Sequence, residues 1–449
     1  MITSPAFAGK RYVVLGLARS GMAAVESLLA GGAHVTAWDS REEPRRALEG
    51  RGVELADPLG IDLAGCDGVV VSPGVPLNVH PIAAHAAAFG VPVIGDIELF
   101  ALARPSLPPH RVVGITGTNG KSTTTALVDH IIRCAGMPVR MGGNIGLPIL
   151  SQDPLGPGGV YVLELSSYQI DLTHGLACDV AALLNITPDH LDRYDGFAGY
   201  AAAKARLFAL QQADQCAVFG VGDADTGAIA AREQARRGAQ QVRCVDGADI
   251  AGYQSEWPSL QGPHNLQNAA VAVAIVEALG IGADQWRPAL ASFHGLPHRM
   301  ERVAEAGGVL FINDSKATNP ASTAPALAAF PPIDHRRIHW ILGGLPKGED
   351  LDECAPFFGN VAAAYTIGEA GPRFAELLEP HLPVVRSEMM GDAIRQAIEA
   401  ARPGDVVLLS PACASFDQFR DYEARGDNFR QIVHALLETG GSAPNGGAA

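Results

Sequence analysis

The segment GITGTNGKSTTT at residues 114–125 constrains the fold of this chain more than any other part of the sequence. It follows an apolar strand-like run and leads into a stretch whose apolar residues recur at helical spacing. A strand, a glycine-rich turn and a helix in this order form a phosphate-binding loop, because glycines let backbone N–H groups close on phosphate oxygens at the positive end of the helix. The sequence therefore predicts an α/β protein that binds a nucleoside triphosphate.

Within this loop, Lys121 is placed to reach the β- and γ-phosphates, and the Ser122 hydroxyl to bind Mg²⁺. The spacing departs from the full G-x4-GKS pattern, because Ile115 stands at the first position and the glycines fall at 114 and 117. Switch GTPases and motors use loops of the same kind, so the loop alone leaves the reaction open.

The chain is too long for one compact core, and its 449 residues predict three domains. Strand-like runs alternate with helical patterns throughout, which indicates parallel sheets. A Pro-rich connector at 104–110 and the segment GLPHR at 295–299 divide the pattern. We expect a Rossmann-like N-terminal domain at residues 1–103, a central P-loop-type ATPase domain at 104–297 and a C-terminal Rossmann-like α/β domain at 298–449.

Composition excludes several classes of protein. With 33 Lys and Arg against 48 Asp and Glu, the formal net charge of −15 argues against general nucleic-acid binding. No apolar run approaches the roughly 18 residues of a membrane span, and the first residues lack a secretion-signal pattern. Seven scattered cysteines without a CxxC motif are typical of reduced thiols. We expect a cytoplasmic monomer with small-molecule partners and neither nucleic acid nor membrane as a partner.

A second glycine-rich turn, GLARSG at residues 16–21, follows the first predicted strand. It resembles the dinucleotide fingerprint with Ala18 at the middle glycine, and Asp39 ends the next strand. This pattern favours either NAD, and hence a dehydrogenase, or the diphosphate of another nucleotide. The segment SPGV at 72–75 closes a further strand and is expected to line the same crevice.

Candidate metal ligands follow strands of the central domain. Glu164 stands near the end of a buried strand, where parallel sheets face their ligands. The segment NITPDHLDRY contains Asp189, His190 and Asp192, whose spacing suits a divalent ion. Lys204 lies among alanines on the next helix, and it is one of only five lysines in a chain that otherwise uses arginine.

Three polar loops are expected at one edge of the third sheet. They are NDSKATNP at 313–320, GGLPKG at 343–348 and SPACASFDQF at 410–419. Each segment alone has the composition of an ordinary turn. Together, with two of the five lysines, they indicate a small anionic substrate.

The motifs GTNGKST, LELSSYQ, NITPDHLDRY, AAAKARLF, HNLQNA, GLPHR, NDSKATN and SPACASFDQF occur here in the order found in the Mur ligases. The resemblance covers residues 11–435, and SPGV, NDSKATN and SPACASFDQF are more particular to the branch that adds D-glutamate. It implies an ATP-dependent amide ligase of peptidoglycan synthesis. Such an enzyme adds D-glutamate to UDP-N-acetylmuramoyl-L-alanine through an acyl phosphate.

The resemblance also implies roles for individual residues, including two Mg²⁺ ions and a CO₂-derived carbamate on Lys204. Residues implied at the UDP-linked substrate are Gly16, Leu17, Ala18, Arg19, Ser20, Gly21, Asp39, Ser40, Arg41, Ser72, Gly74 and Asn144. Those implied at ATP are Gly117, Thr118, Asn119, Gly120, Lys121, Ser122, Thr123, Asn268, Arg299 and Asp314. Those implied at glutamate are Thr318, Lys347, Ser415 and Tyr422. The implied metal ligands are Ser122, Glu164, His190 and the Lys204 carbamate, and the implied catalytic residues are Lys121, His190, Lys204 and Lys316.

Two differences from the family pattern both concern residues that the resemblance implies at glutamate. The loop around Lys347 reads GGLPK where GGDGK is frequent, and Tyr422 replaces a phenylalanine. The alternatives are a related ligase that adds L-glutamate or another amino acid, a regulatory P-loop ATPase and an NAD-dependent dehydrogenase. The last two functions do not account for several of the polar loops.

Overall fold

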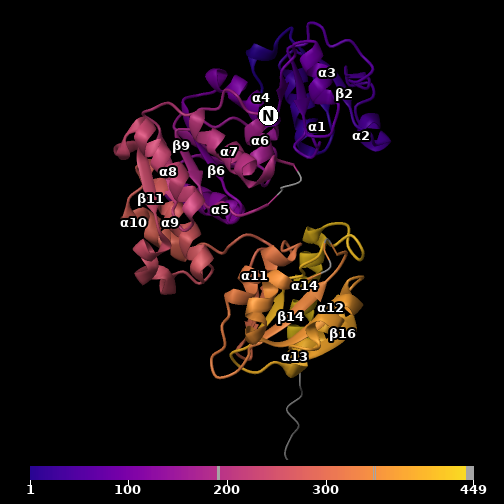
Figure 1. The fold of residues 1–449 in the computed structure, drawn as a ribbon, viewed down its shortest axis with the longest axis vertical. Helices are drawn as coiled ribbons and strands as arrows, with labels where there is room; N and C mark the ends of the chain where they lie inside the picture. The colour runs from indigo at the N-terminus through magenta and orange to yellow at the C-terminus, as the bar shows by residue number, and fades with distance from the viewer. Residues whose placement is uncertain (190–192, 347, 349, 441–449) are drawn as a thin grey trace, which may run out of the picture. The chain divides into compact units, whose positions relative to one another are not determined.

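A computed structural model describes residues 1–189, 193–346, 348 and 350–440 (Figure 1). His190, Asp192 and Lys347, which the sequence marks as candidate site residues, lie outside these residues. The chain forms two compact units: Met1–Gly252 with Leu266–Ala291, and Tyr253–Asn265 with Ser292–Ala449. No helix in the described ranges has both the length and the apolar character needed to cross a membrane.

The N-terminal part of the first unit contains a parallel five-stranded sheet in the order β3-β2-β1-β4-β5. Its strands are β1 (Arg11–Leu15), β2 (His34–Trp38), β3 (Glu54–Leu55), β4 (Gly68–Val71) and β5 (Val93–Ile94). Its helices are α1 (Arg19–Ala30), α2 (Glu42–Arg46), α3 (Ile82–Ala88) and α4 (Asp96–Ala103), with 3-10 turns η1 (Pro5–Phe7) and η2 (Arg104–Ser106). This order reverses direction beside β1, which is where a doubly wound sheet opens a ligand crevice.

The rest of the first unit is built on a parallel six-stranded sheet in the order β11-β10-β9-β6-β8-β7. Its strands are β6 (His110–Thr116), β7 (Val139–Gly143), β8 (Gly159–Glu164), β9 (Val180–Leu183), β10 (Cys216–Gly220) and β11 (Val242–Val245). Its helices are α5 (Lys121–Cys134), α6 (Ser167–Asp171), α7 (Gly196–Ala209), α8 (Ala224–Arg237) and α10 (Ala283–Ala291), with 3-10 turns η3 (Ile149–Ser151) and η4 (Ala239–Gln241). The 3-10 turn η5 (Gly247–Glu256) and helix α9 (Pro263–Ala278) each have residues in both units. Strands β6, β8 and β9 are almost wholly apolar and buried, as expected of a parallel sheet covered on both faces.

The two sheets of the first unit are joined through α4. Glu98 accepts hydrogen bonds from the backbone N–H groups of His174 (2.6 Å) and Gly175 (2.8 Å). The Phe100 ring packs edge-on against Tyr161, with 5.1 Å between ring centroids. One apolar cluster runs across both sheets, which explains why they form one compact unit.

The second unit has a six-stranded sheet in the order β12-β13-β17-β14-β15-β16, parallel except for the edge strand β12. Its strands are β12 (Glu301–Ala306), β13 (Val309–Asn313), β14 (Ile338–Gly343), β15 (Val361–Ile367), β16 (Val384–Glu388) and β17 (Val406–Leu409). Its helices are α11 (Pro320–Ala328), α12 (Gly371–Leu378), α13 (Met390–Ala400) and α14 (Tyr422–Gly440), with η6 (Asp352–Asn360).

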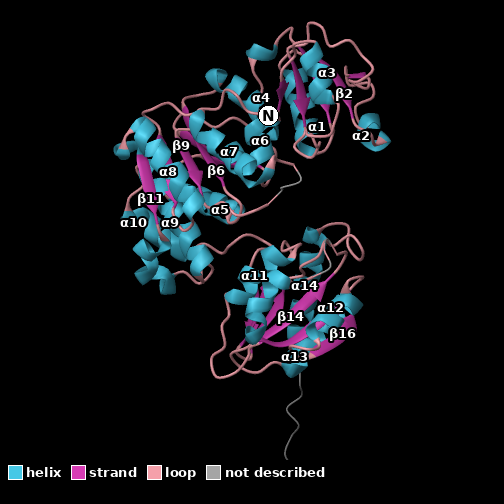
Figure 2. Cartoon of the chain, in the orientation of Figure 1, coloured by secondary structure: helices cyan, strands magenta, loops and turns pink. Residues whose placement is uncertain are grey.

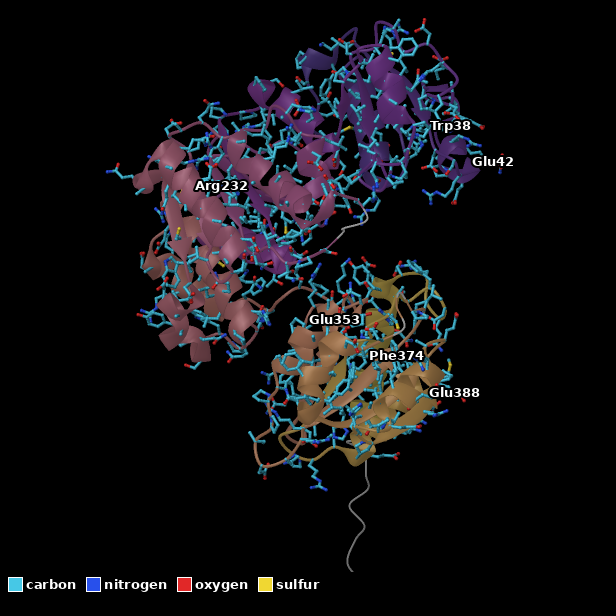
Figure 3. All side chains as sticks on the ribbon, in the orientation of Figure 1. Trp38, Glu42, Arg232, Glu353, Phe374 and Glu388 are labelled. Carbon is cyan, nitrogen blue, oxygen red and sulfur yellow. The ribbon has the colours of Figure 1, made fainter. Side chains whose placement is uncertain are left out.

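Helices cover both faces of this third sheet (Figure 2). Trp340 and Leu342 of β14 pack in one apolar cluster, and Ile341 between them packs in the other. The first cluster includes Phe374 of α12, which Figure 3 labels. The alternation is the period-2 pattern of a strand buried on both sides. The predicted three-domain α/β fold is confirmed in its three sheets, and the domain boundaries at 103/104 and 297/298 stay a prediction.

A chain of polar side chains lies where β14 and β17 begin. The Asp405 carboxylate is 2.7 Å from His335 Nε2 and 3.1 Å from His339 Nε2, and His339 Nδ1 is 3.0 Å from the Tyr365 hydroxyl. Burial lowers the pKa of His339, whereas the hydrogen bonds to Asp405 and Asp334 raise the pKa of His335.

These opposite shifts predict opposite pH responses. A raised folded-state pKa makes His335 stabilise the fold below its unfolded pKa of about 6.5, and this contribution is lost as pH rises through the folded value. A lowered pKa makes His339 stabilise the fold above about pH 6.5, and this contribution is lost on acidification. Between about pH 8 and about pH 5.5, His335→Gln should therefore steepen the loss of stability on acidification, and His339→Gln should reduce it. Urea unfolding at both pH values measures the slopes, and equal slopes in the two variants would contradict the assignment.

Candidate functional site

The predicted phosphate loop has the required geometry between β6 and α5. Gly117 and Gly120 have positive φ angles of 152° and 82°. A Cβ at Gly120 would lie 2.1 Å from the side-chain oxygen of Asn268, which is buried on α9. Glycine is therefore required here, and Asn268 adjoins the loop, as the sequence predicted. Lys121, Ser122 and Thr123 form the first turn of α5.

The segment after β9 holds the loop in shape. The backbone N–H of Thr118 donates to the Asn185 carbonyl (3.0 Å), and that of Asn119 donates to the Asn185 side chain (2.9 Å). The Thr118 hydroxyl accepts from the backbone N–H of Thr187 at 3.0 Å and lies 3.2 Å from the Tyr200 hydroxyl. The loop is thus fixed before any ligand binds.

Two lysines point at one carbonyl of this loop. Lys121 donates to the carbonyls of Gly117 (2.9 Å) and Thr118 (2.7 Å), and Lys204 of α7 donates to Gly117 at 2.8 Å. Only 1 % of Lys204 is exposed, and its ammonium lies 4.5 Å from the centre of the Tyr200 ring. Burial, together with the charge of Lys121, lowers the pKa of Lys204 to about 7. Near neutral pH, much of Lys204 is therefore an uncharged amine.

Glu164 ends β8 beside the loop, because β8 pairs with β6 in a register that sets Glu164 opposite Ile115. One carboxylate oxygen accepts from the Asn144 side chain at 2.9 Å, and the Glu164 carbonyl accepts from the Asn144 backbone N–H at 2.8 Å. The other carboxylate oxygen, Oε2, is buried and has no hydrogen-bond partner among the described residues.

A buried carboxylate oxygen without a donor fits a bound cation, because burying it alone is costly. Mg²⁺ prefers carboxylate and hydroxyl oxygens, and Ser122 lies in the helix turn that follows the paired strand β6. No group of three His, Cys, Asp or Glu side chains suited to a metal occurs in the described part of the chain. His190, which the sequence also marks as a ligand, lies outside that part.

The second predicted nucleotide turn lies between β1 and α1. A Cβ at Gly21 would come within 1.9 Å of the Gly16 carbonyl oxygen, so the turn tolerates only glycine there. The Ser72 hydroxyl donates to the same carbonyl at 2.7 Å. Arg19 donates to the Gly146 carbonyl at 2.8 Å, which joins this turn to the loop that carries Asn144. The predicted sugar-nucleotide residues of the two loops are therefore brought together.

Asp39 is engaged by the protein itself. It accepts from the backbone N–H groups of Leu17 (2.7 Å) and Arg41 (2.9 Å), and Arg41 Nε lies 3.3 Å away. Burial opposes its ionisation, but these bonds and the Arg41 charge outweigh burial and lower the pKa of Asp39. In a dehydrogenase this carboxylate binds the ribose hydroxyls of NAD, so its use here as a loop anchor disfavours that alternative. Beside it, Arg45 stacks on the Trp38 ring at 4.2 Å (Figure 3).

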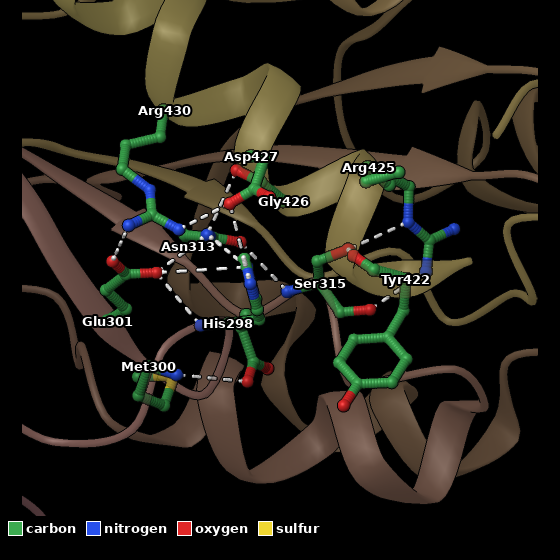
Figure 4. Close-up of polar contacts among 12 residues, drawn as sticks. His298, Met300, Glu301, Asn313, Ser315, Tyr422, Arg425, Gly426, Asp427 and Arg430 are labelled. Atoms are coloured by element: carbon green, nitrogen blue, oxygen red, sulfur yellow. Dashed lines mark hydrogen bonds and ion pairs between the residues drawn. The ribbon is translucent and has the colours of Figure 1, made fainter. Parts of the chain in front are cut away.

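In the second unit, a buried arginine that the sequence analysis missed holds three loops together. Figure 4 shows its contact with Ser315. Only 1 % of Arg425 is exposed, and burial lowers its pKa to about 10, so it stays charged. It donates to the carbonyls of Ser315 (2.9 Å), Cys413 (3.0 Å) and Ala414 (3.1 Å), and to the Ser315 hydroxyl (3.0 Å). It also reaches the Gly343 carbonyl at 3.5 Å. The three polar loops predicted at this sheet edge do gather there.

Predicted residues of these loops lie close to Arg425. Asp314 is buried and accepts from the Ser410 hydroxyl (2.8 Å) and the Met300 N–H (3.1 Å), and burial raises its pKa to about 7. The Lys316 ammonium lies 3.8 Å from the centre of the Tyr422 ring, a cation–π contact. Ser415 is buried, Thr318 is partly buried and Lys347 lies outside the described residues.

Three family models match successive parts of the chain. The Mur ligase MurD-like N-terminal domain matches residues 10–95, the Mur ligase middle domain 115–243, and the Mur ligase glutamate ligase domain 298–413.

Relatives match the chain over almost its whole length. It is 74 % identical to the UDP-N-acetylmuramoylalanine–D-glutamate ligase of Novosphingobium aromaticivorans, with 98 % of this chain and 97 % of the relative covered. It is 61 % identical to the enzyme of the same name from Sphingopyxis alaskensis, with 97 % and 100 % covered.

Solved structures share the fold at low sequence identity. A MurF ligase from Thermotoga maritima in complex with ADP has a TM-score of 0.59 at 15 % identity, with 96 % of each chain covered. The MurC ligase of the same organism has a TM-score of 0.57 at 16 % identity, with 95 % of this chain and 99 % of that chain covered.

The bonds of Arg425 predict that lysine cannot replace it. A single ammonium cannot span carbonyls from two loops, and unsatisfied buried acceptors cost about 1–3 kcal/mol. We predict that Arg425→Lys lowers the free energy of unfolding by about 1–3 kcal/mol in urea titrations. Arg420→Lys is the matched control, because the Arg420 side chain is 82 % exposed. Equal stability of the two variants would contradict the proposed anchoring.

Proposed function

Because this chain belongs to the Mur ligase family, we infer that it is an ATP-dependent ligase that joins D-glutamate to UDP-N-acetylmuramoyl-L-alanine in peptidoglycan synthesis. The structural observation that supports this most is the phosphate loop with two lysines on one side and the donor-free oxygen of Glu164 next to the paired strand. The identity of the amino acid rests on the named relatives.

The chemistry explains why these groups are needed. A carboxylate does not react with an amine at neutral pH, so it must first be activated. Transfer of the γ-phosphoryl group of ATP to the alanyl carboxylate gives an acyl phosphate and ADP. The glutamate amine then attacks the acyl carbon, loses a proton, and phosphate leaves from the tetrahedral intermediate. All reactants are anionic, so the site must supply positive charge and N–H donors.

We assign the ATP phosphates to the loop Gly117–Gly120 and the first turn of α5. Lys121 now donates to two loop carbonyls, and it would turn to the phosphates when they bind. Asn268 beside Gly120, together with Arg299 and Asp314, completes the proposed ATP contacts. Lys316 is assigned to the transferred phosphate, and Thr318, Lys347, Ser415 and Tyr422 to the incoming glutamate.

The sugar-nucleotide substrate is assigned to the turn after β1. Residues Gly16–Gly21 would lie against the diphosphate, with Ser72 and Gly74 near the same ligand. Asp39, Ser40 and Arg41 would lie near the uracil, where the Arg41 side chain is 66 % exposed. Asn144 reaches the same substrate from the loop to which Arg19 is bonded.

Ser122 and Glu164 are the proposed ligands of one Mg²⁺, and His190 with a carbamate on Lys204 those of a second. Mg²⁺ would offset the negative charge of the phosphates during transfer. The protein orients the Glu164 carboxylate through Asn144, which donates a hydrogen bond to one of its oxygens. The other oxygen, Oε2, is left to bind a cation.

A carbamate on Lys204 requires a free amine. The neutral amine nitrogen bonds to the carbon of CO₂ and releases one proton, so that the uncharged amine becomes an anionic carbamate. An ordinary lysine is almost fully protonated at neutral pH, but burial lowers the pKa of Lys204 to about 7. The amine is thus available for this reaction where an exposed lysine is not.

Location and assembly are also part of the proposal. We propose that the chain acts in the cytoplasm, where ATP and UDP-linked precursors occur, and that it acts as a monomer. The proposed domains are residues 1–103 for the UDP-linked substrate, 104–297 for ATP and 298–449 for glutamate.

The function is tested by phosphate release with ATP, Mg²⁺ and UDP-N-acetylmuramoyl-L-alanine, with D-glutamate or L-glutamate in parallel. We expect release that depends on D-glutamate. Release with L-glutamate alone would move the chain to a sister specificity and point to Tyr422 and the Lys347 loop. No release with either amino acid, from folded protein that binds ATP, would contradict the substrate assignment.

The carbamate predicts chemical rescue. Lys204→Ala should lose activity by a factor on the order of 10²–10³, because one stabiliser of the transferred charge is gone. A short carboxylic acid such as formate or acetate, which restores a carboxylate in the vacated space, should recover part of it. Lys121→Ala is the control that should not respond to the acid. Failure of every acid to rescue folded Lys204→Ala would count against the carbamate.

A further inference from the structure

The chain makes a strained turn directly before β12. His298 and Met300 have φ angles of 62° and 47°, a left-handed conformation that residues other than glycine seldom adopt. Such a conformation is unfavourable for residues other than glycine and persists only where the surroundings enforce it. Enforced strain of this kind is concentrated at functional positions.

Glu301 provides one enforcing contact. Its Oε2 accepts from the backbone N–H of His298 and from the side-chain amide of Asn313, both at 2.9 Å (Figure 4). Asn313 is fully buried at the end of β13, and the same amide nitrogen lies 3.2 Å from the Gly426 carbonyl and 3.0 Å from His298 Nδ1. Glu301 and Asn313 thus tie the turn to the sheet and to α14.

Other contacts fix the remaining peptide groups of the turn. The Met300 N–H donates to Asp314 at 3.1 Å, and the His298 carbonyl accepts from the Lys316 N–H at 3.0 Å. A Cβ at Gly426 would lie 2.1 Å from His298 Nδ1, so the helix backbone packs directly on the imidazole. The turn cannot relax without breaking several of these contacts together.

Arg299 stands between the two strained residues. Its own N–H donates to the Leu296 carbonyl at 3.2 Å. Its guanidinium is near enough to Asp314 to oppose the burial-driven rise in the pKa of that carboxyl. One turn therefore sets the positions of both Arg299 and Asp314, which are the two residues of this unit assigned above to ATP.

We propose that Glu301 and Asn313 are positioning residues for ATP: they hold the 298–300 turn in its strained form, so that Arg299 and Asp314 are preorganised as a nucleotide-binding pair. This rests on the proposed function in one respect, the assignment of Arg299 and Asp314 to ATP. Preorganisation of this kind improves affinity by removing an ordering cost at the moment of binding. Strain in the free protein is its expected signature.

The first test compares Glu301→Gln with Arg430→Met. Both N–H groups bond to the same oxygen of Glu301, so glutamine can accept from them only through its neutral carbonyl oxygen, with its amide nitrogen facing Arg430. A neutral acceptor is weaker than a carboxylate, and an amide N–H beside a guanidinium is unfavourable, so the turn loosens. We expect KM for ATP to rise about tenfold, equal to about 1.4 kcal/mol, with kcat within about twofold and KM for the sugar nucleotide unchanged. Arg430 pairs with the other oxygen of Glu301 at 3.4 Å, so Arg430→Met removes that ion pair and should leave all three constants unchanged.

The second test separates positioning from stability. Met300→Gly and Met300→Ala remove the same side chain, but only glycine accepts the left-handed conformation without strain. We expect Met300→Gly to melt about 2–4 °C above Met300→Ala and yet to have the higher KM for ATP, because its turn is free to relax. A merely structural role would instead give the higher KM for ATP to Met300→Ala, the less stable variant.

Two results would overturn the proposal. One is an unchanged KM for ATP in folded Glu301→Gln, and the other is a higher KM for ATP in Met300→Ala than in Met300→Gly. The wild-type reaction with D-glutamate, run beside the variants, reports separately on the proposed function. If wild type is inactive, nucleotide affinity measured by equilibrium dialysis replaces KM and gives the same comparison.

Discussion

The parallel pairing of β6 with β8 is the interaction on which the proposed site depends. Its register sets Ile115 opposite Glu164, so that the phosphate loop and the carboxylate leave the sheet side by side. The burial of both strands makes the register firm, because a slip of one residue would turn every apolar side chain to the other face. Asn144, Ser122 and Lys204 all take their positions from elements that start at this edge or pack on it.

Although the net charge of the chain is −15, buried cationic side chains lie next to the loops proposed to bind the anionic substrates. Lys204 and Arg425 are both almost fully buried, and they donate hydrogen bonds to carbonyl or hydroxyl oxygens of the loops proposed to bind substrates. For both groups burial is the largest influence on the pKa and lowers it, and it outweighs the attraction of the nearby carboxylates. In Lys204 this environment favours the free amine, and in Arg425, whose pKa stays far above neutrality, it favours a permanent cation that organises three loops.

The sequence was sufficient for the three-sheet α/β fold and for the phosphate loop, because glycines, Lys121 and Ser122 follow a strand in a spacing with a direct physical meaning. The edge strand β12 runs antiparallel, which alternating strands and helices did not indicate. Arg425 and Glu301 were missed because each reads in sequence as an ordinary polar residue on a helix or in a strand. Asn313 begins the predicted polar loop at 313–320, but the sequence pattern indicated no role for it individually. Their roles come from burial and from contacts between distant segments, such as Arg425 with Ser315. Lys204 was found through a family resemblance, and only the fold reveals that its amine is desolvated against the Gly117 carbonyl.

The central claim is that the donor-free oxygen of Glu164 and the phosphate loop together form the metal–ATP site. A crystal structure of the chain with Mg²⁺ and a non-hydrolysable ATP analogue tests it most directly. We expect Mg²⁺ bonded to Glu164 Oε2 and to the Ser122 hydroxyl, with the γ-phosphate on the same ion. A Mg²⁺-bound nucleotide elsewhere, with Oε2 of Glu164 still lacking a partner, would contradict it.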